Sequence, residues 1–191
     1  WGNIYLVKAE FSGSLVKGTG INIGTDADIF ISVSSSTPGT LADLYGTLYN
    51  AVTQTGYVAR KQNVSIGTTV NSYKIDLIPG RRQSQYGNDH SLYKNKTGSW
   101  TQTNISTHIS HVTGSNRIEE IRLAKIWRQL HNLEFPSFYL ELAVIDALKY
   151  STVGAISNNF WKVLEFFRDN LSSTKYVDPA NTNNIISDDL N

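Results

Sequence analysis

The 191-residue sequence contains no cysteine and no methionine. The lack of cysteine excludes disulfides and zinc sites built from thiolates, and it fits a protein of the reducing cytoplasm. No apolar run approaches the ~20 residues that a membrane span needs, so no membrane contact is expected. The formal net charge is only +1, so bulk charge does not indicate nucleic acid as a partner. The composition therefore indicates one globular domain, or two small lobes that share a core.

Strand patterns dominate the first 80 residues. Ile4 to Phe11 is expected to form a strand that leads into a Gly-Ser turn, and the apolar, β-branched run from Ala27 to Val33 is typical of a buried strand. Alternating positions from Val58 to Ile66 predict another strand. Val70 to Ile78 predicts its hairpin partner, which we expect to end at Pro79-Gly80.

Helical spacing dominates the second half of the chain, after a polar and turn-rich stretch at residues 80–104. Helices are expected from Ile118 onward, from Phe135 to Tyr150 and from Asn159 to Leu171, with Ser115 as a candidate cap of the first. One earlier helix is expected from Leu41 to Val52. Strands followed by helices predict an α+β fold. We expect a sheet lobe at residues 1–104, a helical lobe at residues 105–191 and an active-site cleft between them.

Three aspartates stand out in the strand-rich half. Asp26 and Asp28 are two residues apart at the start of a predicted strand, so their side chains point to the same face. Asp76 lies in a second apolar run of similar character. If the two strands are neighbours, three carboxylates converge, and such a cluster is costly unless cations neutralise it. Hard divalent cations such as Mg²⁺ prefer these oxygen ligands.

These aspartates belong to an ordered set of motifs that extends through most of the chain. Gly13-Ser14-Leu15-Val16-Lys17-Gly18-Thr19 precedes the first two aspartates, and four later segments follow the third. They are Trp100 to Asn104, Ile121 to Trp127, Pro136 to Glu141 and Asp178 to Asn181. The set resembles the polymerase-β-type nucleotidyltransferases. It is most similar to the branch that contains oligoadenylate synthetase, the cyclic GMP-AMP synthases and the bacterial CD-NTases.

The resemblance implies a template-independent transfer of nucleotides from NTPs, assisted by two ions of Mg²⁺ or Mn²⁺. Asp26 and Asp28 should hold both metals, and Asp76 should hold the metal nearer the acceptor hydroxyl and help to deprotonate it. Gly13 and Ser14 should offer backbone and hydroxyl donors to phosphate oxygens at a strand-to-helix turn.

The resemblance also implies nucleotide contacts in the helical half. Lys125 should contact the β- and γ-phosphates, Ser137 the triphosphate, and Phe138 the face of the base. Lys17 is expected near the site, whereas Glu141 is expected to be structural. His108 and His111 are three residues apart, but without cysteine or a third ligand they do not indicate a zinc site.

The leading hypothesis is a bacterial synthase of cyclic or linear oligonucleotide messengers, of the kind that serves antiviral defence. One alternative is CCA-type addition of nucleotides to tRNA 3′ ends, which the near-neutral charge disfavours because phosphate contacts dominate RNA affinity. Another is a catalytically silent nucleotide-binding module, and a toxin-like transferase that modifies a protein or tRNA is a third. A regulatory partner is left open. Trp1 lies only twelve residues before Gly13, so the native protein is expected to extend further at the N-terminus, and Asp188-Asp189-Leu190-Asn191 resembles an interrupted end.

Overall fold

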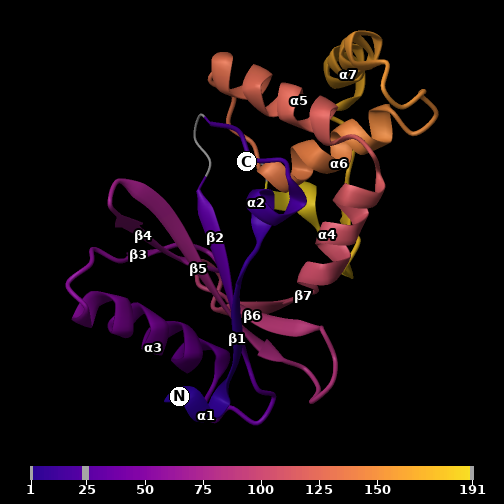
Figure 1. Cartoon of the computed structure of the whole chain (residues 1–191). Helices are drawn as coiled ribbons and strands as arrows, with labels where there is room; N and C mark the ends of the chain where they lie inside the picture. Colours follow the sequence, from indigo (N-terminus) through magenta and orange to yellow (C-terminus); the bar gives the residue numbers. More distant parts are fainter. Residues whose placement is uncertain (1, 23–25, 190–191) are drawn as a thin grey trace. The chain divides into compact units, whose positions relative to one another are not determined.

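The structure is a computed structural model that describes residues 2–22 and 26–189. The described chain divides into two compact units. The first contains residues 2–16 and 26–106 and carries the main sheet, and the second contains residues 17–22 and 107–189 and is mostly helical (Figure 1). The expected α+β fold is confirmed. The sequence did not indicate that residues 17–22 pack with the second unit.

The first unit is built on a seven-stranded mixed sheet. Its order is β1-β2-β5-β4-β3, with β6 pairing with β5 and β7 with β6. The β2–β5 pair is parallel and every other pair in this sheet is antiparallel. The strands are β1 (Leu6–Phe11), β2 (Ala27–Val33), β3 (Arg60–Lys61), β4 (Ile66–Val70), β5 (Tyr73–Arg82), β6 (His90–Lys94) and β7 (Ser99–Thr103). Two short helices, α1 (Gly2–Tyr5) and α2 (Gly13–Lys17), flank β1.

Helix α3 (Leu41–Gln54) packs on one face of this sheet. Thr40 and Asp43 form a capping box at its start, so two backbone N–H groups that the helix itself leaves unpaired gain acceptors. Tyr45, Leu48 and Val52 face the sheet and form a core cluster with Ile66. Partly buried Ile31 and Leu77 also pack against this cluster, so odd-numbered positions of β2 and β5 face α3.

The even-numbered positions therefore face the other side of the sheet. Phe30 is fully buried there, with the His90 ring edge-on to it at 4.8 Å between ring centroids. A side chain at Gly80 would collide with Phe30, because a Cβ would lie 2.5 Å from Phe30 Cζ. Asp28 and Asp76 share this face by the same alternation.

Five of the predicted bounds need correction. The strand predicted from Val70 begins at Tyr73, because Val70 is the last residue of β4. The first strand begins at Leu6, not Ile4, because α1 occupies Gly2–Tyr5. The alternation from Val58 to Ile66 does not form one strand: only Arg60–Lys61 pairs before β4 begins. The remaining two corrections concern Pro79-Gly80 and residues 80–104.

β5 continues through Pro79-Gly80 to Arg82, so the predicted end at this dipeptide was wrong. On one side Pro79 pairs in register with Ile31 of β2. On the other side β4 pairs only as far as Leu77 and β6 begins to pair at Arg81. Pro79 thus falls between two neighbours, where a missing N–H breaks no ladder. Residues 80–104, expected as turns, contain the β6–β7 hairpin, in which Tyr93 pairs with Trp100.

The second unit contains four helices, a short hairpin and a final 3₁₀ turn. They are α4 (Ile105–Gly114), α5 (Ile118–Leu130), α6 (Ser137–Ala147), α7 (Ile156–Asn170), β8 (Val177–Asp178), β9 (Asn181–Ile185) and η1 (Ile186–Asp189). The last three predicted helices are present: α5 begins at Ile118 as predicted, and α6 and α7 have shifted ends. All four helices contribute to one core, which includes Val112, Ile121, Val144 and Val163, each fully buried. Within residues 2–22 and 26–189, no helix combines the length and apolar character that crossing a membrane requires.

Ser115 does not cap α5 as the sequence suggested. Arg117 occupies the N-cap position, and no side chain there hydrogen-bonds to the first turn. The Ser115 hydroxyl instead donates to the Val112 carbonyl, 2.6 Å away, at the end of α4. The serine therefore closes the preceding helix.

Candidate active site

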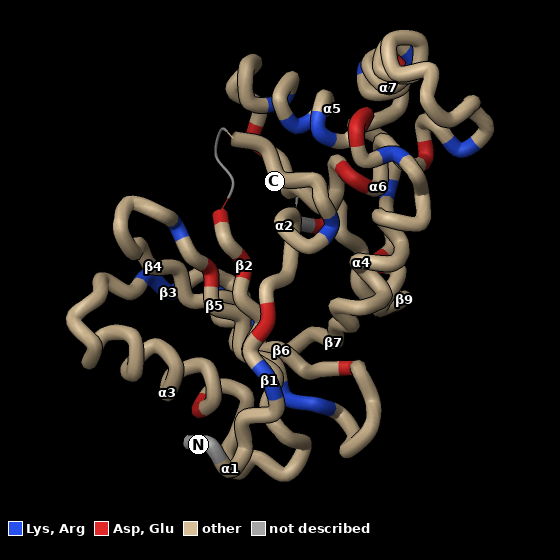
Figure 2. The backbone as a smooth tube through the Cα atoms, viewed as in Figure 1, with Lys and Arg blue, Asp and Glu red and all other residues tan. Residues whose placement is uncertain are grey.

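Asp28 and Asp76 lie side by side on parallel neighbouring strands. In the β2–β5 ladder, Asp28 is the register partner of Asp76. Register partners in a sheet project to the same face, here the face opposite α3. Asp26 immediately precedes β2, two positions from Asp28. Figure 2 shows acidic positions at the neighbouring strands β2 and β5. The strand neighbourhood on which the sequence argument depended is therefore present.

Two features of its surroundings raise the pKa of the Asp76 carboxyl group. Burial raises its pKa, and the negative charge of Asp26 raises it further. The pKa is lowered in turn by a hydrogen bond from Gln62 and by the positive charges of Arg60 and Lys74. These effects do not cancel the rise. The ionised form of Asp76 thus lacks enough positive charge around it.

This donor set has the chemistry that a hard divalent cation requires, because such cations prefer carboxylate oxygens and Asp28 and Asp76 share one sheet face. In the described part of the chain, however, no group of three or more His, Asp or Glu side chains lies close enough together to hold a metal ion. The metal roles of Asp26, Asp28 and Asp76 therefore stay predictions. The raised pKa of Asp76 is the observation that fits a cation, because a cation would stabilise the ionised carboxylate.

The Gly13-Ser14 turn lies directly against Asp28. Gly13 has a φ of +59°, in the left-handed region, and opens α2 right after β1. A Cβ at Gly13 would lie 1.7 Å from Asp28 Oδ2, so only glycine fits beside this carboxylate. The backbone N–H of Ser12 donates to the Asp28 carbonyl at 2.8 Å. The predicted strand-to-helix turn is present, with half-buried Ser14 in its first turn. Its phosphate contacts stay a prediction.

Gln62 is a site residue that sequence reasoning missed. Its Nε2 donates to Asp76 Oδ1 at 3.1 Å, and its Oε1 accepts from the hydroxyl of Ser65. The only sequence signal was its place in a strand-like segment before the Asp76 strand, and that signal does not specify a contact.

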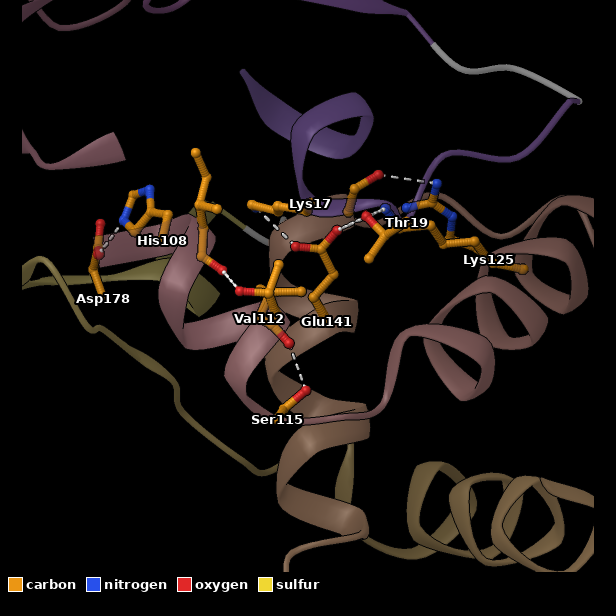
Figure 3. A network of polar contacts seen from close by, with 12 residues as sticks. Lys17, Thr19, His108, Val112, Ser115, Lys125, Glu141 and Asp178 are labelled. Atoms are coloured by element: carbon orange, nitrogen blue, oxygen red, sulfur yellow. Dashed lines mark hydrogen bonds and ion pairs between the residues drawn. The ribbon is translucent and has the colours of Figure 1, made fainter. Parts of the chain in front are cut away.

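In the second unit, Lys17, Thr19 and Lys125 converge on Glu141 (Figure 3). Lys17 Nζ donates to Glu141 Oε2 at 2.8 Å, and Lys125 Nζ donates to Glu141 Oε1 at 2.7 Å. The Thr19 hydroxyl donates to Oε1 at 2.7 Å and accepts from Lys125 at 2.9 Å. All four residues are buried. The expectation that Glu141 is structural fits this geometry, since it joins residues 17–19 to α5 and α6.

The cluster carries a surplus of positive charge, because two ammonium groups share one carboxylate. Burial alone would raise the pKa of Glu141, but the charges of Lys17 and Lys125 and their hydrogen bonds hold it below its usual value. Burial lowers the pKa of Lys125, and the neighbouring Lys17 and Arg128 lower it further against the pull of Glu141. A buried positive surplus attracts anions.

Ser137 and Phe138 open α6 next to this cluster. The Phe138 ring lies under Lys17 Nζ, 4.3 Å from ring centroid to nitrogen, and beside the His108 ring at 4.6 Å between centroids. The exposed Ser137 hydroxyl accepts from Arg128 Nη2 at 3.2 Å. Arg128 lies three positions after Lys125 on α5, so helical spacing contained this signal, but the sequence reasoning did not use it.

His108 has a carboxylate partner, Asp178. Its Nε2 lies 2.6 Å from Asp178 Oδ1, and Asp178 also accepts from the Ala180 N–H and the Asn184 amide. Asp178 belongs to the Asp-Pro-Ala-Asn motif, so this motif ties the β8–β9 hairpin to α4. The absence of a zinc site at His108 and His111 stays a prediction.

The comparisons with known proteins identify the fold. No family model matches the sequence. The curated "Cyclic AMP-AMP-AMP synthase" of Escherichia coli (strain MS 115-1) is 23% identical over 180 residues, which cover 86% of this chain and 56% of that protein. The chain thus spans just over half the length of this relative.

Two solved structures are similar over almost the whole chain. CdnC of Escherichia coli MS115-1, in complex with HORMA-deltaN, has a TM-score of 0.72 at 20% identity, covering 97% of this chain and 70% of CdnC. The CD-NTase CdnG of Bradyrhizobium diazoefficiens, in complex with GTP, has a TM-score of 0.76 at 12% identity, covering 98% of this chain and 72% of CdnG. The resemblance to bacterial CD-NTases that the motifs indicated is confirmed: the chain has the CD-NTase fold, and its sequence is related to that of a cyclic AMP-AMP-AMP synthase.

Proposed function

We propose that this protein is a nucleotidyltransferase that joins NTPs into a cyclic or linear oligonucleotide messenger, using two Mg²⁺ or Mn²⁺ ions. The observation that carries the proposal is the in-register pair Asp28–Asp76 on parallel strands, with Gly13 packed against Asp28. The similarity to a cyclic AMP-AMP-AMP synthase and the GTP complex of the structural neighbour CdnG support NTPs as substrates.

In the proposed reaction, an acceptor hydroxyl oxygen forms a bond to the α-phosphorus of an NTP. The bond from that phosphorus to the bridging oxygen breaks, and pyrophosphate leaves with the electron pair. Cations bound at Asp26, Asp28 and Asp76 would neutralise the charge that develops on the phosphate oxygens. Asp76 would accept the hydroxyl proton as the general base.

The first unit would also bind phosphate at the Gly13-Ser14 turn. Because Gly13 carries no side chain, phosphate oxygens can approach its backbone closely, and the Ser14 hydroxyl adds a donor. In the second unit we assign nucleotide contacts to Lys17, Lys125, Ser137 and Phe138. The positive surplus around Glu141 supports this assignment. Arg128, which already donates to Ser137, adds a further cation.

The proposal is tested by incubating the full-length protein with each NTP, singly and in pairs, with Mg²⁺ or Mn²⁺. Products are resolved by mass spectrometry, which separates cyclic from linear oligonucleotides. Asp76→Asn is the matched inactive control, because it keeps the side-chain shape and removes the base and metal ligand. Equal product from the wild type and Asp76→Asn contradicts the proposal.

The same experiment separates the alternatives. Product that forms only when tRNA is added would indicate CCA-type addition. Binding of NTPs without any turnover, in the presence of any candidate activating partner, would indicate a silent module. The complex of CdnC with HORMA-deltaN motivates assays with a protein activator.

A further inference from the structure

A polar chain in the first unit leads from the core to the side chain of Asp76. It begins at Tyr45 of α3, whose hydroxyl oxygen lies 2.8 Å from the Gln62 carbonyl and 3.0 Å from the Ser65 carbonyl. Tyr45 is buried, and the Gln62 N–H also donates to the Ser65 carbonyl at 3.0 Å. The turn from Gln62 to Ser65 is thus fixed to α3 before either side chain makes a contact.

The side chains of this turn then fix one orientation of an amide. An ionised carboxylate only accepts hydrogen bonds, so the group that faces Asp76 must be the amide NH₂ of Gln62. Its Nε2 lies 3.1 Å from Asp76 Oδ1. The Gln62 Oε1 consequently faces Ser65, whose hydroxyl donates to it. A flipped amide would turn its Oε1 toward the ionised carboxylate and lose the bond to Asp76, and the Ser65 hydroxyl would have to accept instead of donate.

Gly67 provides the space for this contact. It is the register partner of Asp76 on β4. A Cβ at Gly67 would lie 2.7 Å from Gln62 Nε2 and 3.2 Å from Asp76 Oδ1. A methyl group here would therefore push the amide away from the carboxylate. The backbone of Gly67 is not in the left-handed region, so alanine is compatible with the strand conformation.

We infer that Gln62, held by Ser65 and Tyr45 and accommodated by Gly67, is the positioning residue for the Asp76 carboxylate. It holds one oxygen by a hydrogen bond and thereby fixes the direction of the other. The inference rests on the proposed function, in which Asp76 is a base and a metal ligand. Outer partners of metal-ligating carboxylates typically contribute about 10–100-fold to metal affinity or activity.

The test uses Gln62→Leu, which removes the amide at similar size, and Gly67→Ala, which displaces it from a second position. Mn²⁺ binding to the full-length protein without nucleotide is followed by electron paramagnetic resonance. NTP turnover is measured separately. We expect each variant to weaken Mn²⁺ binding and to lower kcat by about tenfold, with KM for NTP changed less than about twofold.

Gln83→Leu is the matched control, because the exposed Gln83 side chain donates only to Ser91, at 3.2 Å, among the contacts of the described residues. It should leave binding and turnover unchanged. In the double variant Gln62→Leu/Gly67→Ala the two effects should not add, because both act on the same contact. Ser65→Ala, which frees the amide to rotate, should give a smaller loss. Melting curves identify any variant that fails to fold, and Ser65→Ala then provides the decisive measurement.

Two failures are distinguishable. If Asp76→Asn turns over NTPs at the wild-type rate, the proposed function is wrong. If Asp76→Asn is inactive while Gln62→Leu, Gly67→Ala and Ser65→Ala all bind Mn²⁺ and turn over like the wild type, Asp76 is functional and the role of Gln62 is overturned.

Discussion

Lys125 and Glu141 form a buried ion pair whose nitrogen and oxygen lie 2.7 Å apart, with 4% and 1% of their side chains exposed. A second cation, Lys17, binds the other oxygen of the same carboxylate. Glu141 therefore compensates two ammonium groups at once. A buried pair of this kind contributes little compared with an apolar replacement, but removal of one partner leaves uncompensated charge.

Glu141→Gln should strongly destabilise the second unit, because it leaves Lys17 and Lys125 buried without a counter-ion. We expect a loss of about 3–5 kcal/mol in the free energy of unfolding, measured by urea denaturation followed by tryptophan fluorescence. Glu119→Gln is the control, since Glu119 pairs with Arg122 on the exposed side of α5 and such pairs contribute about 0–1 kcal/mol. Equal losses in the two variants would contradict the counter-ion role.

The Glu141 carboxylate should also make the stability of the protein depend on pH in the acidic range. The folded-state pKa of Glu141 lies below its ordinary value of 4.5 because Lys17 and Lys125 stabilise the ionised form. Its contribution is therefore complete above about pH 4.5 and is lost as pH falls through the folded-state pKa. Urea titrations from about pH 6 to about pH 3 should show a steeper loss for the wild type than for Glu141→Gln. Parallel curves would show that the pKa of Glu141 is the same in the folded and unfolded protein, which contradicts the stabilisation of its ionised form by Lys17 and Lys125.

Much of the fold could be predicted because local pattern and tertiary context agree. β2 occupies Ala27–Val33, the predicted run, since a β-branched and largely apolar segment followed by turn residues has few alternatives. Pro79 shows the opposite case. A proline ends a strand only where a neighbouring strand would need its backbone N–H as a hydrogen-bond donor. Beside Pro79 there is a gap between β4 and β6, and the residues around Pro79 in the sequence do not reveal this gap.

The residues of the candidate site also fall into those that the sequence indicated and those that it did not. Alternation predicted that Asp26 and Asp28 share a face, and the order of motifs in the resemblance indicated Asp76 as their neighbour. The register of β2 and β5 places Asp28 beside Asp76, while their metal roles stay predictions. Gln62 and Glu141 contact their partners through side chains that no period specifies, and the partners of Glu141 are distant in sequence. The pairing of Lys17 with Glu141, 124 positions apart, exists only once residues 17–22 pack with the second unit.

Asp76→Asn should stabilise the metal-free protein while it abolishes nucleotide transfer. The folded-state pKa of Asp76 is raised, so its contribution to stability is complete below the ordinary value of 3.8 and is lost as pH rises through the folded-state pKa. At neutral pH the carboxylate therefore costs stability that asparagine does not. Because the group is partly solvated, the gain should be at most about 1 kcal/mol, or about 2–4 °C in Tm.

Melting curves in EDTA at neutral pH and near pH 3.5 check this prediction for Asp76. The difference between the variant and the wild type should shrink at the lower pH, where the carboxyl group is protonated. Addition of Mg²⁺ should raise the Tm of the wild type more than that of Asp76→Asn. A variant that is less stable than the wild type at neutral pH would show that Gln62, Arg60 and Lys74 already compensate the charge.

Gly13→Ala and Gly46→Ala should have opposite effects, although both replace glycine with alanine in the first unit. At Gly13, the positive φ and the approach of Asp28 Oδ2 to 1.7 Å from the new Cβ force the turn or the carboxylate to move. We expect a loss of about 1–3 kcal/mol in stability, together with at least a hundredfold loss of NTP turnover, since displacing a group in the site by about 1 Å costs that much.

Gly46 lies inside α3, and a methyl group added to it would have no atom within 4 Å, so alanine there meets open space. Alanine in a helix interior is better than glycine by about 0.5–1 kcal/mol, and Gly46→Ala should raise the Tm without changing turnover. Both variants are compared by thermal melting and by NTP turnover under one set of conditions. Gly13→Ala with wild-type turnover would mean that the Gly13 turn does not determine where the Asp28 carboxylate acts, and the phosphate-binding role assigned to this turn would have to be abandoned.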